Sequence, residues 1–227
     1  MNVRGFESGA SSDVKARLLR WFVFIALFVW LGLAIGLARF WILGLIFIAT
    51  AAYASATVDP TLYAERLRPA GPTIDRDALR AIRLLAGAEI AIALLDIGRF
   101  HWSDTVPPAI QLPAMIFFAA SMAIGVRAMG TNRFFSSAVR VQTDRGHRVV
   151  TGGPYGIIRH PGYLGMLVGA PAAALALGSW WAVIPAIGYS ALIARRAAME
   201  DRYLREQLDG YSEYAARVPY KLIPGIW

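Results

Sequence analysis

The 227-residue chain contains no cysteine. This absence excludes disulfides, thiolate metal sites and a cysteine nucleophile. There are only three histidines, at His101, His147 and His160. Their separation does not match the spacing of a metal site, so no metal is expected.

Acidic residues are also scarce, with 15 Asp and Glu against 23 Lys and Arg, which gives a formal net charge of +8. The basic residues lie beside apolar runs and lack the interleaved aromatic residues or loop motifs that contact bases. This pattern indicates membrane topology and anionic lipid, and no nucleic-acid partner is expected.

Hydrophobic residues dominate the remainder of the chain. Hydrophobic residues make up 57% of it and the mean hydropathy is +0.48. The apolar residues come in blocks close to the ~20 residues needed to cross a bilayer. The sequence therefore predicts an all-α, polytopic transmembrane helical bundle of about six spans, with a range of roughly five to seven. We expect one membrane domain over residues 1–227, in contact with the lipid bilayer. Nothing in the sequence specifies an oligomeric state.

The predicted spans cover residues 21–38, 40–57, 81–98, 109–129, 163–177 and 180–195. The first two are separated only by Arg39, which indicates a helical hairpin or, alternatively, one long kinked helix. Basic residues precede the first span and follow the fourth, so the positive-inside rule places both termini in the cytoplasm. No small-residue cleavage site follows the first apolar run, and we expect that span to be retained. The predicted location is a bacterial inner membrane.

Two acids lie inside the predicted third span. Asp96 is expected to pair with Arg99, three residues later, near the end of the span. Glu89 lies in the middle, where an acid is a functional candidate. It is expected either to pair with an arginine across the bundle or to meet a polar substrate head group.

A charged segment over residues 58–80 is predicted to be a cytoplasmic loop. Asp59-Pro60 breaks the preceding helix, and a Pro-Ala-Gly-Pro turn follows at 69–72. Residues 63–68 are expected to be solvated or to form a short interfacial helix.

The most polar stretch within the apolar part is 146–165, GHRVVTGGPYGIIRHPGYLG. Its Gly-Gly-Pro at 152–154 excludes a regular helix, because glycine weakens a helix and proline lacks the N–H donor. Arg159, His160 and Tyr163 then lie within about one helical turn of a predicted membrane boundary, where polar groups need partners. The chain is expected to form a loop here that carries a site.

This stretch resembles the core of the isoprenylcysteine carboxyl methyltransferase family. The shared pattern is Gly-His-x-x-Val-x-x-Gly-x-Tyr, then Arg-His-Pro-x-Tyr, then an Arg with a Glu four residues on. It is met by Gly146-His147, Val150, Gly153, Tyr155, Arg159 to Tyr163, and Arg196 with Glu200. The resemblance runs from about Asn132 to the C-terminus. It implies an integral membrane methyltransferase that uses S-adenosyl-L-methionine, with residues 131–227 as a cytoplasmic, cofactor-binding core and residues 1–130 as helices for acceptor access.

The same resemblance implies the site residues. The cofactor site would consist of Arg140, His147, Arg148, Val149, Val150, Tyr155, His160, Pro161, Gly162, Tyr163 and Glu200. Glu200 would hold the methionine ammonium or face the sulfonium, and Arg196 would orient the acceptor, which makes these two the catalytic candidates. Their four-residue spacing places them on one helix face, although it also fits an ordinary salt bridge at a helix end.

The acceptor is expected to be lipophilic or small. Methylation of a carboxylate oxygen requires positioning more than deprotonation, whereas S- or N-methylation would need a base, for which His160 or Glu200 is the first candidate. A different reading comes from residues 218–225 together with Arg159-His160-Pro161, which look like the C-terminal region of NADPH-dependent sterol reductases. A non-catalytic membrane protein or a small transporter is the remaining alternative.

Overall fold

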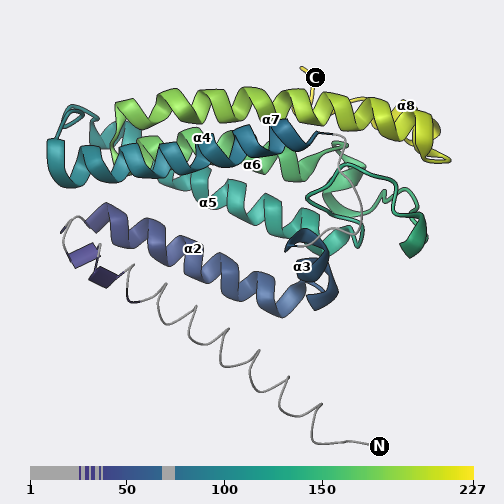
Figure 1. Ribbon diagram of the computed structural model, residues 1–227, viewed down its shortest axis with the longest axis horizontal. Coiled ribbons are helices and arrows are strands. Elements are labelled where there is room, and N and C mark those ends of the chain that lie inside the picture. The colour runs from purple at the N-terminus through teal and green to yellow at the C-terminus, as the bar shows by residue number, and fades with distance from the viewer. Residues whose placement is uncertain (1–25, 27–28, 31, 34–35, 37, 68–74) are drawn as a thin grey trace, which may run out of the picture. The chain divides into compact units, whose positions relative to one another are not determined.

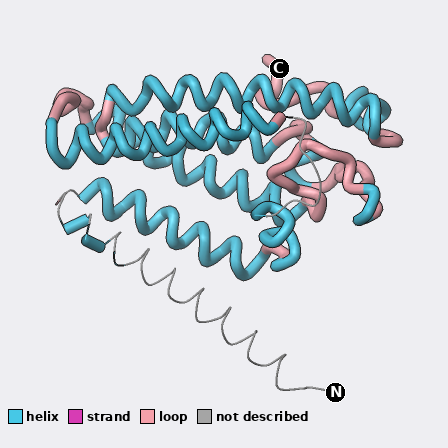
Figure 2. Tube along the Cα trace, viewed as in Figure 1, coloured by secondary structure: helices cyan, strands magenta, loops and turns pink. Residues whose placement is uncertain are grey.

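The computed structural model describes residues 26, 29–30, 32–33, 36, 38–67 and 75–227. Within these residues the secondary structure is helical and contains no strand, as Figure 2 shows. The predicted all-α class is therefore confirmed. The basic residues before the first predicted span, and most of that span, lie outside the described residues. The chain divides into two compact units, residues 1–41 and 42–227.

In the first unit, the described residues correct the position of one helix boundary. The break was expected at Arg39, but the non-helical residue is Gly36, with φ +66°. Glycine adopts this left-handed conformation without a steric penalty. Helix α2 (Ala38–Thr57) starts two residues later, so Arg39 belongs to its first turn.

The second unit contains the remaining helices (Figure 1). They are α3 (Pro60–Leu67), α4 (Arg76–Leu95), α5 (Pro108–Thr131), α6 (Pro161–Leu177), α7 (Trp180–Gln207) and α8 (Tyr211–Arg217). Helix α5 packs against α6, α6 against α7, and α7 against α4. The segment between α5 and α6 is mostly irregular, as its Gly-Gly-Pro predicted.

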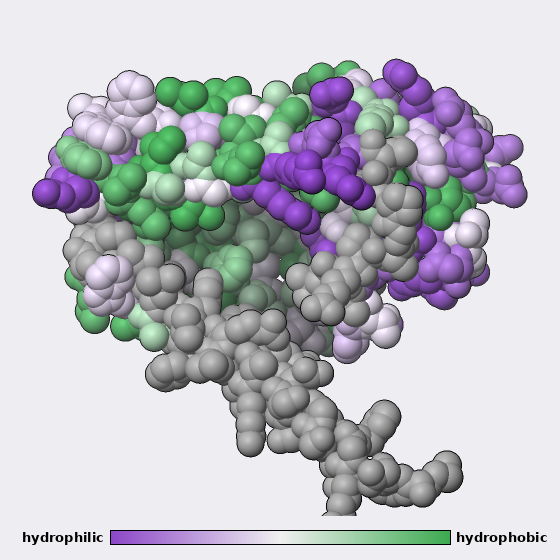
Figure 3. All heavy atoms as spheres, viewed as in Figure 1, coloured by the Kyte–Doolittle hydropathy of each residue, from purple (hydrophilic) through white to green (hydrophobic). Residues whose placement is uncertain are grey.

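Helices α2 and α5 are long and apolar enough to cross a membrane, and α6 is a shorter apolar helix. Large apolar side chains such as Leu84, Ile116 and Ile187 are exposed on the outer faces of α4, α5 and α7. In Figure 3, hydrophilic residues gather around the end of the second unit that carries α8, while hydrophobic residues cover the helices beside it. This distribution fits a membrane protein, and the count of about six spans stays a prediction.

Helices α5 and α6 approach closely at two glycines. A Cβ added to Gly165 would lie 2.7 Å from the Ser121 carbonyl oxygen, and one added to Gly169 would lie 2.7 Å from the Ser121 Oγ. Neither position has room for a side chain. The small residues on this face of α6 therefore let it contact α5 directly.

A buried carboxylate, that of Asp96, links the segment between α4 and α5 to the residue that precedes α7. Asp96 lies in a π-helical turn, η1 (Asp96–Phe100), and accepts hydrogen bonds from the Ser179 hydroxyl at 2.5 Å and the Ser103 N–H at 2.9 Å. The expected pair with Arg99 is wrong, because the π turn directs Asp96 inward and leaves Arg99 exposed. Ser179 also caps α7 by accepting from the Ala182 N–H.

The segment over 60–67 is helical, which fits the short helix expected for residues 63–68 and not the solvated segment. It forms α3, in which Leu62 is almost fully buried and packs with Ala54, Val58 and Val126. A short helix with a buried leucine is a packed element and not a solvated loop. Its next turn carries Glu65 and Arg66, which face the site described below.

Candidate active site

A cavity of about 430 Å³ lies in the second unit, between α4, α7, the start of α6 and the irregular segment after α5. Most of the site residues expected from the sequence line it. These are Arg140, His147, Arg148, Val149, Val150, Tyr155, His160, Gly162, Tyr163, Arg196 and Glu200. Pro161 does not line it. This proline is fully buried as the first residue of α6, where its missing N–H costs nothing.

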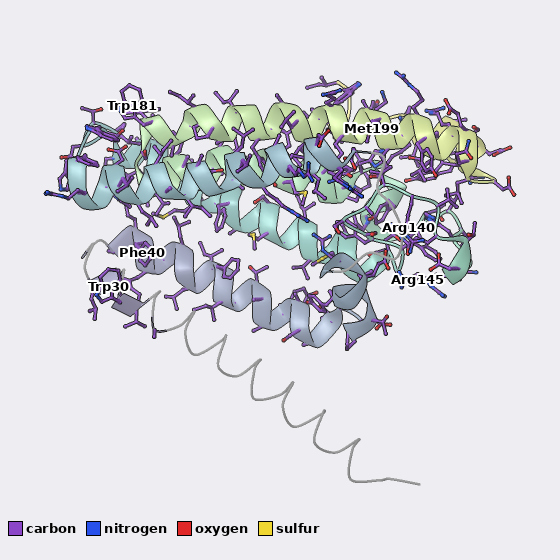
Figure 4. The ribbon with its side chains drawn as sticks, in the orientation of Figure 1. Trp30, Phe40, Arg140, Arg145, Trp181 and Met199 are labelled. Carbon is purple, nitrogen blue, oxygen red and sulfur yellow. The ribbon has the colours of Figure 1, made fainter. Side chains whose placement is uncertain are left out.

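Figure 4 shows where this site lies along the bundle. Arg140, beside the cavity, is at one end, and Trp181 is near the other end, at the start of α7. Trp181 packs edge-on against Trp102, which stacks on Phe100. The aromatic cluster and the cavity are thus at opposite ends of α7.

Arg196 and Glu200 both line the cavity, but they do not pair with each other. The Tyr163 hydroxyl donates a hydrogen bond of 2.6 Å to Glu200. The Nε of Arg196 lies 2.9 Å from a carboxylate oxygen of Asp75, and another guanidinium nitrogen donates to the Ser137 carbonyl at 2.5 Å. The ordinary salt bridge that fits the four-residue spacing is absent between these two described residues. Each of them is held by a different partner.

Asp201, the residue after Glu200, is the main anchor of the Arg-His-Pro motif. Its carboxylate accepts from Arg159 at 2.6 and 3.2 Å and from the Tyr211 hydroxyl at 3.1 Å. The Nε2 of His160 lies 3.4 Å from the same carboxylate. Burial alone would raise the pKa of Asp201, but hydrogen bonds from His160 and Arg159 and their charges bring it well below its ordinary value.

Sequence reasoning missed Asp201, although a signal for it was present. An arginine buried at a membrane boundary needs a carboxylate, and the acids of the α7 segment were the candidates. Glu200 was chosen because it matches the family pattern. Asp201, about 100° further round the helix, is the acid that contacts Arg159.

The C-terminal tail completes this anchor. The backbone N–H groups of Arg159 and His160 donate to the carbonyls of Tyr220 and Lys221, at 3.0 and 2.9 Å. The Arg159 guanidinium also donates to the Val218 carbonyl at 2.6 Å. The C-terminal tail therefore folds back onto the Arg-His-Pro motif.

His147 is held as a neutral ring. Its Nδ1 accepts from the Gln142 backbone N–H at 3.2 Å, and its ring packs at 4.5 Å on Phe134. Burial, helped by the charges of Arg140 and Arg145, lowers the pKa of His147 to about 4. At neutral pH this side chain contributes a flat, uncharged surface to the cavity.

Tyr155 forms part of the cavity wall from a short 3₁₀ turn, η3 (Gly153–Gly156). Its hydroxyl accepts from Asn132 at 3.3 Å and donates to the Ala128 carbonyl at 3.4 Å. Its own carbonyl accepts from the Tyr214 hydroxyl at 2.7 Å. Burial raises the pKa of Tyr155, so the phenol stays protonated.

Comparison with known proteins identifies the region that carries most of these residues. Residues 111–206 match the family described as isoprenylcysteine carboxyl methyltransferase (ICMT). This region belongs to the ICMT family. The match covers most of α5, all of α6, most of α7 and the segment between α5 and α6. The family resemblance stated from the motifs is confirmed.

Three relatives are similar to parts of the chain. Protein-S-isoprenylcysteine O-methyltransferase B of Arabidopsis thaliana is 33% identical over 92 residues, 38% of this chain and 45% of the relative. A Delta(14)-sterol reductase of Mus musculus is 32% identical over 91 residues, 38% of this chain and 22% of the relative. The cobalt-zinc-cadmium resistance protein CzcN of Cupriavidus metallidurans is 31% identical over 134 residues, 56% of each chain. The matched parts span from about a fifth to just over half of these relatives.

Part of the cavity lies outside the ICMT-family region and was not anticipated. Helix α4 contributes Leu79, Ile82, Arg83 and Ala86, and α3 contributes Arg66. Leu79, Ile82 and Ala86, together with Met166 of α6, give the cavity an apolar wall, and Arg66 and Arg83 add positive charge beside it. The sequence carried no motif in α3 or α4 that would have placed them at the site.

Glu89 lies on α4, one turn beyond Ala86, and is buried but does not line the cavity. No arginine among the described residues pairs with it, so the expected pair across the bundle is not found in this part of the chain. Among the same residues, no cluster of three His, Cys, Asp or Glu is arranged to hold a metal ion.

Proposed function

We propose that the chain is an integral membrane methyltransferase that uses S-adenosyl-L-methionine and acts on a carboxylate oxygen of a lipophilic or small acceptor. The observation that carries this proposal is the cavity itself. Within the ICMT-family region, it places a carboxylate, Glu200, and a guanidinium, Arg196, on one face of α7, opposite an irregular segment with its own polar backbone groups.

The residues present fit the cofactor. A volume of about 430 Å³ is within the range of small-molecule sites. The Glu200 carboxylate, oriented by Tyr163, would attract the positive charge of the methionine part. Residues 147–150 and the rings of Phe134, His147 and Tyr155 offer polar backbone and aromatic surfaces to the adenosine part. When bound, S-adenosyl-L-methionine supplies an activated methyl group.

The chain's own contribution to the reaction would be positioning and charge. Asp75 and the Ser137 carbonyl fix the Arg196 guanidinium, which could then hold an anionic acceptor in line with the methyl group. A carboxylate acceptor needs no proton removal. His160, already engaged with Asp201 and Tyr211, would serve to hold the site together.

The topology belongs to the same proposal. The protein would cross a bacterial inner membrane about six times, with both termini and the cavity on the cytoplasmic side. The abundance of arginine around the cavity and in the segment after α5 supports this orientation.

One observation favours a second candidate, an NADPH-dependent reductase. The mouse sterol reductase is 32% identical over 91 residues, nearly the same identity and length as for the plant methyltransferase. The residues of Arg159-His160-Pro161 and the tail are the part that fits this reading.

Calorimetric titration of the detergent-purified protein distinguishes the two. S-adenosylhomocysteine and NADPH are titrated separately into the wild type, into Glu200→Gln and into Glu206→Gln, an exposed acid on the same helix as a control. The proposal expects saturable S-adenosylhomocysteine binding that only Glu200→Gln weakens. Binding of NADPH alone would favour the reductase, and binding of neither would overturn both.

A further inference from the structure

The last turn of helix α3 is held to the cavity wall by hydrogen bonds of Glu65 and Arg66. The Glu65 carboxylate accepts from Arg140 at 3.2 Å and from the Ser136 hydroxyl at 3.0 Å. The Ser137 hydroxyl donates to the Arg66 carbonyl at 2.7 Å. These contacts join residues more than 70 positions apart, and they hold the next side chain, Arg66, at the cavity.

The Arg66 guanidinium is supported by an aromatic ring. Its central carbon lies 4.7 Å from the centroid of Phe135, in a cation–π arrangement. Phe135 in turn occupies the space left by the missing side chain of Gly162, where an added Cβ would overlap the ring. The glycine of the Arg-His-Pro-Gly-Tyr motif therefore makes room for the ring that supports Arg66.

The charge of Arg66 is not balanced within the described part of the chain. No carboxylate there pairs with it, and Glu200 is the one acid among the residues lining the cavity. Burial lowers the pKa of Arg66, and the positive charge of Arg196 lowers it further. Arg66 and Arg196 are thus two of the six arginines that line the cavity, and a bound anion between them would relieve both the burial of Arg66 and the repulsion.

Resting on the proposed function, we propose that Arg66 is a second recognition residue for the acceptor. With Arg196 it binds the anionic head group of an amphiphile, whose apolar chain lies along Ile82, Ala86 and Met166. Arg66 of α3, outside the ICMT-family region, then recognises the charge of the acceptor, while residues inside that region hold the cofactor. A neutral amphiphile of the same length would fit the apolar wall but gain nothing from the guanidinium groups.

The test compares a carboxylate with its own ester. Binding of dansyl-undecanoate and of its methyl ester to the full chain in a neutral detergent is followed by fluorescence, with S-adenosylhomocysteine binding measured in parallel. The variants are Arg66→Gln, Arg66→Lys, and Arg80→Gln, which removes an exposed arginine that does not line the cavity. We expect the wild type to prefer the carboxylate, and Arg66→Gln to weaken carboxylate binding about tenfold while ester binding stays the same.

The Arg66→Lys variant keeps the charge and should keep part of the preference, which separates recognition from a folding defect. The inference is overturned if the wild type binds both probes equally, if Arg66→Gln weakens both alike, or if Arg80→Gln has the same effect. If the wild type prefers the carboxylate but does not bind S-adenosylhomocysteine, the proposed function fails and the anion site stands.

Discussion

Arg159 and Asp201 form a buried, bidentate ion pair, with nitrogen–oxygen distances of 2.6 and 3.2 Å. Both side chains are almost inaccessible to solvent. The pair joins the segment just before α6 to α7, at the position next to Glu200. Arg159 lines the cavity but Asp201 does not, so the geometry of the cavity depends on a carboxylate outside its lining.

Replacing Asp201 by Asn should strongly destabilise the protein. The change leaves the Arg159 guanidinium buried without its counter-charge, which costs about 3–5 kcal/mol in comparable sites. Thermal unfolding in detergent measures the loss, and Asp209→Asn, at an exposed position after α7, is the control. An unchanged melting temperature for Asp201→Asn would contradict the anchor role.

Stability should fall as the pH drops from about 6.5 towards 4, because of His147. Its pKa is lowered from 6.5 to about 4 in the fold, so the unfolded chain binds the proton first in this window, and stability rises with pH across it. Asn at position 147 offers an acceptor to the Gln142 N–H but does not titrate. His147→Asn should flatten the dependence of the melting temperature on pH between 4 and 6.5.

The matched control is His101→Asn, since His101 is exposed. Its melting curve should keep the wild-type pH dependence in this window. An equally steep curve for His147→Asn would show that another group causes the dependence.

Gly165→Ala should destabilise the bundle, although alanine is the better helix former. The added Cβ would approach the Ser121 carbonyl oxygen of α5 to 2.7 Å, and overpacking of this kind costs about 1–3 kcal/mol. Gly125→Ala has no atom near its added Cβ and should be neutral or stabilising by up to about 1 kcal/mol. Opposite shifts in melting temperature for the two variants are the expected result.

Removing the hydroxyl that orients Glu200 should weaken S-adenosylhomocysteine binding without unfolding the protein. Tyr163→Phe deletes one hydrogen bond to a charged group, worth about 1.5–3 kcal/mol, or roughly tenfold to a hundredfold in affinity. Calorimetric titration measures this, with Tyr203→Phe on α7 as a tyrosine that does not line the cavity.

The two catalytic candidates, Glu200 and Arg196, should lose methyl transfer for different reasons, which turnover and binding assays together distinguish. Glu200→Gln and Arg196→Ala should both abolish methyl transfer, the first mainly by weakening the cofactor analogue and the second mainly by weakening the acceptor. Full turnover in either variant would contradict the site assignment.

The sequence predicted the parts of the structure that depend on local chemistry. The Gly-Gly-Pro segment indicated an irregular loop, and the motif residues were expected at one site. What it could not predict depends on packing between distant segments. Arg66 reaches the cavity only because α3 is bound by Ser136 and Arg140, and Asp96 turns inward only because a π-helical turn places it under Ser179.

The hydrogen bonds between Arg159 and the tail also set the order in which the site can form. During synthesis, α2 to α7 are made before the carbonyl groups of Val218, Tyr220 and Lys221 exist. Membrane helices can insert and pack as they emerge. Until the tail is made, by contrast, the buried Arg159 of the Arg-His-Pro motif lacks some of its hydrogen-bond acceptors. Assembly of the cavity should therefore be among the last events in the folding of a newly made chain.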